Sequence, residues 1–121
     1  MRFDVKIAPS FGVQLKEILQ KYPNIKDDIR KYIEEFEVTG PKGKQIPSKN
    51  VPGKENKQGF YKDRLPLEPY NIGKSGGLRI ICYCNPCNPS TIILSMAYLK
   101  SELENPTNQM VKKFLREIKR L

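Results

Sequence analysis

Apolar and polar residues alternate at the start of the chain. Phe3, Val5 and Ile7 are separated by Asp4 and Lys6, which is the period of a strand with one buried face. The pattern therefore predicts that the fold begins with a half-buried strand.

Two amphipathic helices are predicted next. Pro9 and Ser10 offer a break and an N-cap, and Asn24 can cap the second helix after Pro23 stops the first. The apolar stripes have helical spacing: Phe11, Leu15, Ile18, Leu19 and Tyr22 in the first helix, and Ile25, Ile29, Tyr32, Ile33 and Phe36 in the second. Because the joint between the helices is short, we expect an antiparallel helical hairpin packed on a sheet.

The hydrophobic pattern dissolves from Gly40 to Gly59. Prolines and glycines interrupt this stretch, and lysines carry its charge: Lys42, Lys44, Lys49, Lys54 and Lys57. We expect a long, mobile, basic surface loop over residues 40–59. The loop can act as a plain linker or as a tether to a phosphate backbone, and we expect a mixture of the two, with contacts that add affinity without base specificity.

Three short strands and a helix complete the chain. The strands are predicted over Phe60–Leu65, Leu78–Cys84 and Thr91–Tyr98, with turn residues between them. Asn105 and Pro106 introduce the last helix, whose apolar stripe is Val111, Phe114, Leu115, Ile118 and Leu121. The order strand, helix, helix, three strands, helix predicts an α+β fold with a mainly antiparallel sheet and helices largely on one side of it.

Net charge narrows the choice of partners. The 121 residues fit a single domain, residues 1–121, and 22 Lys and Arg against 13 Asp and Glu give a formal net charge of +9. That excess favours nucleic acid or an acidic protein as partner, although a merely soluble basic protein has the same composition.

No apolar run approaches a membrane span, and the first residues lack a signal-peptide core. We therefore expect a soluble, cytoplasmic protein without membrane contact.

The cysteines cluster as Cys82, Cys84 and Cys87. An odd number without an export signal argues against a disulfide scaffold. A tetrahedral zinc site would need a fourth ligand from a carboxylate or a second subunit, since the chain has neither a fourth Cys nor a His. We interpret Cys82 and Cys84 as small apolar residues on one face of a strand and expect no metal or other cofactor.

Basic side chains gather on the predicted strands. Alternate residues of a strand share a face, so Lys62 and Arg64 project together, and Arg79 of the next strand can join them. Such a row favours an anion, and phosphate is the obvious one for so basic a chain. The alternatives are that Lys62 and Arg64 form a plain solvated face, and that Arg79 makes a structural ion pair with Asp63 or Glu68.

The available residue types restrict the chemistry. Without His the chain excludes Ser-His-Asp hydrolysis and imidazole acid–base work, and it has no P-loop, dinucleotide fingerprint or paired-carboxylate motif. Lys and Arg can assist cleavage of RNA by its own 2′-hydroxyl. Arg clamps the phosphate, and a Lys whose pKa is lowered by neighbouring cations exchanges protons with the nucleophile or leaving group. DNA has no 2′-hydroxyl, so we expect no action on DNA by the protein itself.

Two segments carry a family resemblance. The runs Phe60–Leu65 and Gly73–Ile81, with the order of the elements, resemble the RelE/ParE toxin superfamily of bacterial toxin–antitoxin modules, and in particular its HigB/RelE-like branch. The likeness continues through Ile92–Lys100 and the last helix, so it covers most of the chain. It implies a RelE-like fold and a ribosome-dependent, metal-independent mRNA endonuclease (an mRNA interferase) that inhibits translation and is masked by a cognate acidic antitoxin.

The resemblance also implies roles for individual residues. Lys62, Arg64 and Arg79 match catalytic positions of RelE, and Lys100 stands one residue beyond the place of another basic residue. RelE uses a tyrosine in its C-terminal segment, whereas this chain has no Tyr after Tyr98. The implied catalytic set is Lys62, Arg64, Arg79, Tyr98 and Lys100, and the implied RNA-binding set is Lys74, Ser75, Lys54 and Lys57. Removing the Arg79 side chain is expected to abolish toxicity and leave the fold intact.

Two other functions stay open at this point. A ParE-like protein poisons DNA gyrase without cutting RNA, but that branch usually lacks the full basic set of Lys62, Arg64 and Arg79. A decayed prophage module would keep the fold and lose the activity. Growth arrest with cut transcripts, arrest with broken DNA, or no arrest distinguishes the three.

Overall fold

The computed structural model describes residues 2–45, 59–84, 90–103 and 106–118. Its elements in chain order are β1 (Asp4–Ile7), α1 (Pro9–Lys21), α2 (Lys26–Thr39), β2 (Lys44–Gln45), β3 (Phe60–Leu65), β4 (Leu78–Tyr83), β5 (Thr91–Leu99) and α3 (Asn108–Ile118). Short 3-10 turns, η1 (Pro23–Ile25), η3 (Glu68–Tyr70) and η4 (Lys74–Gly76), lie between them. The α+β class and the predicted order of elements are confirmed, with β2 as an addition.

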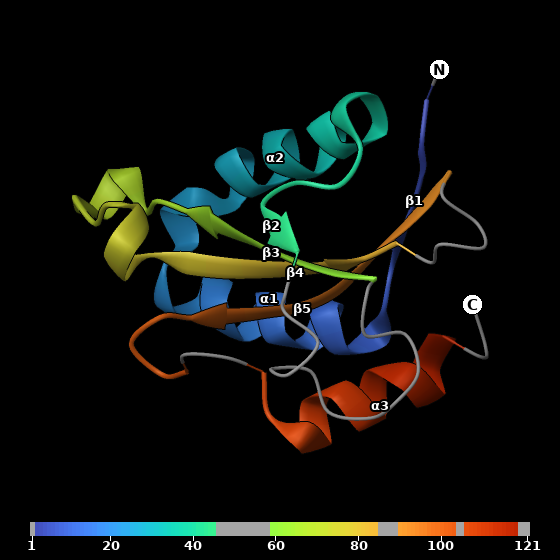
Figure 1. Ribbon diagram of the computed structural model, residues 1–121. Coiled ribbons are helices and arrows are strands. Elements are labelled where there is room, and N and C mark those ends of the chain that lie inside the picture. Colours follow the sequence, from blue (N-terminus) through green and yellow to red (C-terminus); the bar gives the residue numbers. More distant parts are fainter. Residues whose placement is uncertain (1, 46–58, 85–89, 104–105, 119–121) are drawn as a thin grey trace.

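The described strands form a mixed sheet in the order β1-β5-β4-β3-β2. β1 runs parallel to β5, whereas the other neighbouring strands are antiparallel. The parallel pair follows from the path of the chain. The two helices after β1 bring the chain back to the end of the sheet where β1 began (Figure 1). Because β3, β4 and β5 then run in alternating directions, β5 has the direction of β1.

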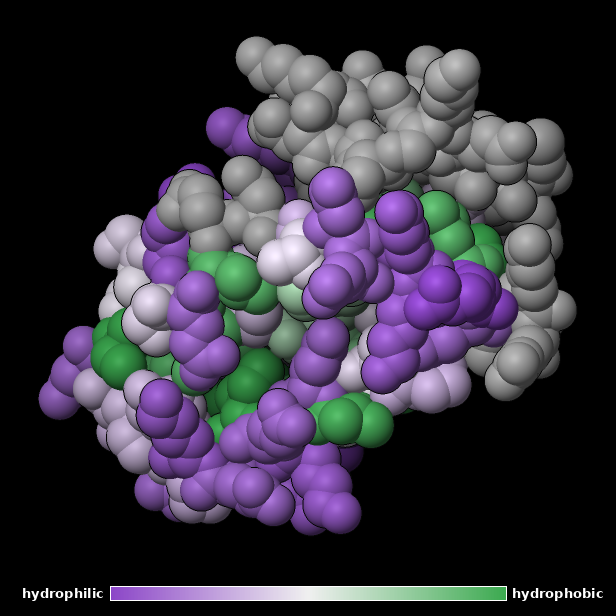
Figure 2. All heavy atoms as spheres, turned by 90° about the horizontal axis from the view of Figure 1, so that it is seen from below, coloured by the Kyte–Doolittle hydropathy of each residue, from purple (hydrophilic) through white to green (hydrophobic). Residues whose placement is uncertain are grey.

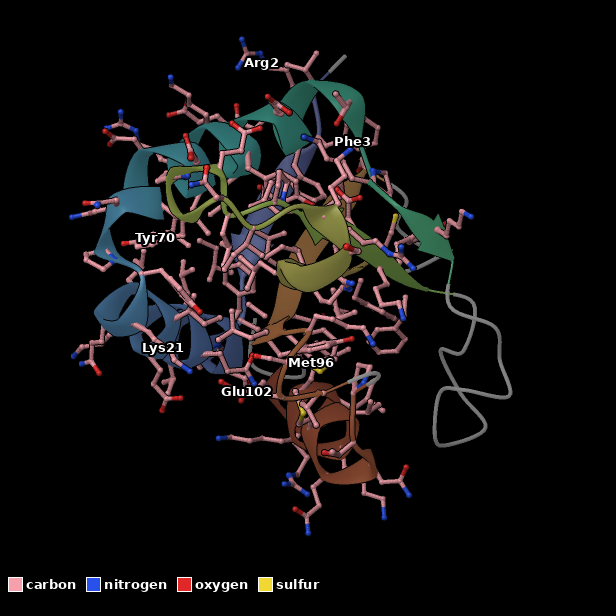
Figure 3. All side chains as sticks on the ribbon, turned by 90° about the vertical axis from the view of Figure 1, so that its left-hand side faces the viewer. Arg2, Phe3, Lys21, Tyr70, Met96 and Glu102 are labelled. Atoms are coloured by element: carbon pink, nitrogen blue, oxygen red, sulfur yellow. The ribbon has the colours of Figure 1, made fainter. Side chains whose placement is uncertain are left out.

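The core lies on both faces of this sheet. α1 and α2 cover one face and pack on Ile80, Cys82 and neighbouring apolar residues. α3 covers part of the other face, where Phe114 packs against Phe60 and Tyr83. In Figure 3, α1 and α2 lie to the left of the strands, while α3 lies below, near Met96. The expectation that the helices lie largely on one side therefore holds for α1 and α2, and α3 departs from it.

The start of α1 differs from the prediction. The helix begins at Pro9 with Ala8 as its N-cap residue, and no side chain caps it locally. Ser10 is therefore inside the helix, where its N–H and hydroxyl donate to the Glu117 carboxylate of α3 at 3.0 and 2.5 Å. A carboxylate from the far end of the chain thus satisfies a backbone donor that a local cap would otherwise satisfy.

The other helix starts also shift. Asn24 does not cap α2, because η1 intervenes and Ile25 is the N-cap residue. α3 begins at Asn108 and the Thr107 hydroxyl accepts the N–H of Met110 at 3.2 Å, so Pro106 lies before the helix and not at its first position. Among the described residues, no helix is long and apolar enough to span a bilayer.

Candidate phosphate-binding surface

The cross-strand register gathers the predicted site residues. Arg64 of β3 lies opposite Arg79 of β4, and Arg79 lies opposite Tyr98 of β5. Lys62 lies opposite Ile81 in the next row. Residues directly opposite each other share a face of the sheet, so these side chains project to the face that α3 partly covers. We call Lys62, Arg64 and Arg79, together with Lys100 just beyond the end of β5, the basic sheet face.

A bulge puts Tyr98 on this face. The register moves from Ile81 opposite Met96 to Cys82 opposite Leu94, which leaves Ser95 as an extra residue in β5. The Ser95 side chain is buried and its hydroxyl donates to the Ile81 carbonyl at 2.8 Å. Because one extra residue reverses the alternation of the strand, Tyr98 faces α3 and not α1. Strand alternation in the sequence alone does not reveal this reversal.

Lys100 is placed by a contact with the turn before β4. Its N–H donates to the Gly77 carbonyl at 3.0 Å. A Cβ on Gly77 would lie 2.3 Å from the Leu65 carbonyl oxygen, so only glycine permits the turn to pack this closely against the end of β3. Gly77 thereby sets the turn beside Lys100.

Arg79 is anchored to the backbone. Its Nη1 donates to the Lys74 carbonyl at 2.8 Å and more weakly to the Leu78 carbonyl at 3.4 Å, and its Nη2 donates to the Ser75 carbonyl at 3.0 Å. Arg79 is only 2% exposed. These contacts argue against the expectation that removal of this side chain leaves the fold intact, because its loss would leave the Lys74 and Ser75 carbonyls without a charged donor.

The structural ion pair considered for Arg79 is also absent among the described residues. Asp63 faces the opposite side of the sheet, where it accepts a hydrogen bond from the Tyr32 hydroxyl at 2.7 Å. Burial, and after it this hydrogen bond, raise the pKa of Tyr32.

Neighbouring cations affect the pKa values of Lys62 and Arg79. Burial lowers the pKa of Lys62, and the charges of Arg64, Arg79 and Lys100 lower it further. Burial and Arg64 also lower the pKa of Arg79. Burial raises the pKa of Tyr98 to about 12, against the opposing effect of Arg79. A bound anion would relieve this repulsion.

The predicted site residues differ in how exposed they are, and therefore in whether a ligand can reach them. Arg64, Lys74 and Ser75 are exposed, and Lys62 and Lys100 are half-buried. Arg79 and Tyr98 are buried, so a ligand can reach them less readily than the five exposed or half-buried residues. Lys54, Lys57 and Cys87 lie outside the described residues.

Lys44 belongs to this surface and sequence reasoning missed it. It was expected in the basic loop, but it lies in β2 directly opposite Lys62. Gly43 makes this pairing possible, since its φ is +90° and a Cβ there would lie 2.2 Å from the Lys62 carbonyl oxygen. The signal in the sequence that could have indicated this strand was Gly43, immediately before Lys44, in a segment otherwise typical of a loop.

Burial makes the two described cysteines less reactive. It raises the pKa of the Cys82 thiol to about 12 and also raises the pKa of the Cys84 thiol, which disfavours the reactive thiolate. Within the described ranges, no group of three or more His, Cys, Asp and Glu side chains could hold a metal ion.

A cavity of about 240 Å³ lies between α1, the end of β5 and α3. Its polar lining includes Gln14, Glu17, Lys21 and Glu102. Gln14 Oε1 accepts the Ala97 N–H at 2.8 Å, which closes part of the sheet edge. Viewed from below, the molecule exposes apolar side chains between hydrophilic ones (Figure 2). With two carboxylates in its lining, this cavity is less suited to phosphate than the basic sheet face.

Comparison with known proteins adds no identification. No protein-family model matches the chain, and no curated protein matches its sequence.

Proposed function

We propose that the protein is a toxin of a type II toxin–antitoxin module that cleaves mRNA on the ribosome. The single observation that carries this proposal is the gathering of Lys62, Arg64, Arg79 and Lys100 on one sheet face, close enough to lower the pKa of Lys62. The order of elements and the sequence resemblance to the RelE/ParE toxins support the choice of mRNA over other polyanions.

The chemistry needs only the groups on this face. A neutral Lys62 amine takes the proton of the ribose 2′-hydroxyl, and the 2′-oxygen bonds to phosphorus as the bond to the 5′-oxygen breaks. Arg64 neutralises charge on the non-bridging oxygens. The Lys100 ammonium donates a proton to the departing 5′-oxygen. The products are a 2′,3′-cyclic phosphate and a 5′-hydroxyl.

The lowered pKa of Lys62 matters for this role. A lysine with an ordinary pKa is almost entirely charged near neutral pH and cannot accept a proton. Burial and the three neighbouring cations destabilise its charged form, so a larger fraction is neutral. The same cations then stabilise the negative charge that develops on the phosphate.

Charge also defines the expected inhibitor. An antitoxin that masks the basic sheet face would present acidic residues to it, so association should slow as salt rises. An association rate that is independent of ionic strength would contradict charge-led masking.

Expression in growing bacteria with transcript mapping tests the function. The wild type should arrest growth and leave transcripts cut at ribosome-occupied codons, and the Lys62→Ala and Arg64→Ala variants should do neither. Lys16→Ala is the matched control, because Lys16 is an exposed lysine on α1, which packs on the other face of the sheet. Arrest with intact mRNA and broken DNA would overturn the proposal in favour of gyrase poisoning, and no arrest would indicate an inactive fold.

A further inference from the structure

The buried guanidinium of Arg79 is committed to the protein's own backbone. Its two terminal nitrogens donate to the carbonyls of Lys74 and Ser75 at 2.8 and 3.0 Å. The side chain therefore bridges β4 and η4, and only 2% of the residue is exposed. A guanidinium that serves as a phosphate ligand would instead direct its planar fork toward the ligand.

Arg64 is better placed to be that ligand. It lies directly opposite Arg79 on the neighbouring strand, and it is exposed where Arg79 is buried. For Arg79 to reach a phosphate it would have to abandon its carbonyl acceptors, leaving them without a charged donor. The two arginines of this row thus differ in what they can contact.

η4 depends on this tether. Its own backbone hydrogen bonds are long, 3.2 Å from the Gly76 N–H to the Gly73 carbonyl and 3.4 Å from the Gly77 N–H to the Lys74 carbonyl. The Arg79 bonds to the turn are shorter and charge-assisted, so they contribute more to its order. The Lys100 N–H in turn donates to the Gly77 carbonyl, which links Lys100 to the same turn.

We infer that Arg79 is a positioning residue and not a phosphate ligand: it holds η4 so that Lys74, Ser75 and Lys100 flank a phosphate bound by Arg64. The role in RNA binding rests on the proposed function. The tether itself follows from the contacts of Arg79 alone.

The test combines RNA binding with hydrogen exchange. The probe is a short single-stranded RNA with every 2′-hydroxyl methylated, so that it binds without being cut. Its affinity is measured by fluorescence anisotropy over a series of salt concentrations. Arg64→Gln should reduce the slope of log affinity against log salt by about 0.7, the value of one phosphate contact on a single strand. Arg79→Gln should weaken binding about tenfold, which is the scale of one charge-assisted contact, and leave the slope unchanged.

Hydrogen exchange reports on the tether separately. Arg79→Gln should speed exchange of the Gly77 and Lys100 amides, and Arg79→Lys, which keeps an ammonium donor for the carbonyls, should restore part of the protection and of the affinity. Tyr32→Phe is the control for destabilisation alone, because it removes a hydrogen bond on the opposite face. It should leave affinity and η4 exchange unchanged at a temperature where all variants are folded.

Each outcome decides the inference. An equal fall in salt slope for Arg79→Gln and Arg64→Gln, with no change in exchange, would show that Arg79 binds phosphate and overturn the inference. Faster exchange with unchanged affinity would leave Arg79 with a purely structural role and also overturn it. If the wild type fails to bind the RNA while Arg79→Gln still speeds exchange, the proposed function fails and the tether stands.

Discussion

Truncation of Glu117 should destabilise the whole domain, although this residue lies close to the end of the described chain. Its carboxylate accepts the Ser10 N–H at 3.0 Å and the Ser10 hydroxyl at 2.5 Å. It therefore serves as the missing N-cap of α1 and joins that helix to α3. The perturbation is Glu117→Ala, which removes both acceptors and leaves Ser10, only 6% exposed, inside the interface.

The size of the effect follows from the bonds removed. Loss of an N-cap acceptor costs about 0.5–2 kcal/mol, and a hydrogen bond to a charged group contributes about 1.5–3 kcal/mol. Because these terms describe overlapping interactions and Glu117 is half-buried, we expect a net loss of about 2–3 kcal/mol in the free energy of unfolding. For a domain of this length that corresponds to a fall in Tm of roughly 10 °C.

Urea unfolding followed by circular dichroism measures this loss. Glu17→Ala is the matched control, because Glu17 is an exposed glutamate of α1, and it should change stability by less than about 0.5 kcal/mol. Ser10→Ala removes the hydroxyl bond but keeps the backbone one, so it should fall between the two. A Glu117→Ala variant as stable as Glu17→Ala would refute the argument that this carboxylate caps α1.

Three further predictions address the sheet and its basic face. Gly43→Ala should destabilise the fold by about 1–3 kcal/mol in urea unfolding, because it strains a positive φ and forces a Cβ against the Lys62 carbonyl; unchanged stability would mean that β2 does not hold this register. Phe114→Ala should cost about 3–5 kcal/mol and detach α3, since the ring is fully buried, and a loss below about 1 kcal/mol would contradict that packing. Burial and neighbouring cations lower the Lys62 pKa, so the RNA cleavage rate should rise with pH as this amine loses its proton. Arg64→Gln removes one repelling charge, so NMR of the Lys62 side chain in this variant should show the amine losing its proton at higher pH than in the wild type; a shift to lower pH would contradict the repulsion between the two residues.

Much of the scaffold could be predicted from hydrophobic periodicity. The stripes of α1 and α2 and the alternation in β3 place their residues as the structure does, because local pattern and burial agree there. The alternation in β1 predicts Ile7 on the buried face together with Phe3 and Val5, and this is wrong for Ile7, which is 49% exposed. The helix starts were less predictable. Ser10 has a cap residue's chemistry but bonds to Glu117, more than a hundred positions away, and local propensity contains no information on such a contact.

In the candidate site, too, some features could be predicted from the local sequence pattern and others could not. Alternation brought Lys62 and Arg64 to one face, and the pairing of β3 with β4 added Arg79. Three features were not predicted. Arg79 donates hydrogen bonds to carbonyls of η4, the bulge at Ser95 turns Tyr98 to the other face, and Lys44 pairs with Lys62. These features depend on backbone paths that the residue types alone do not specify.

The most direct measurement is an amide chemical-shift titration of the labelled protein with the methylated single-stranded RNA. If the basic sheet face holds a ribose–phosphate backbone, the shifted amides should cluster in β3, in η4 and at residues 98–100, and the shifts should fade as salt rises. Shifts confined to α1 and α2, or no shifts at low salt, would contradict the assignment of this face to RNA.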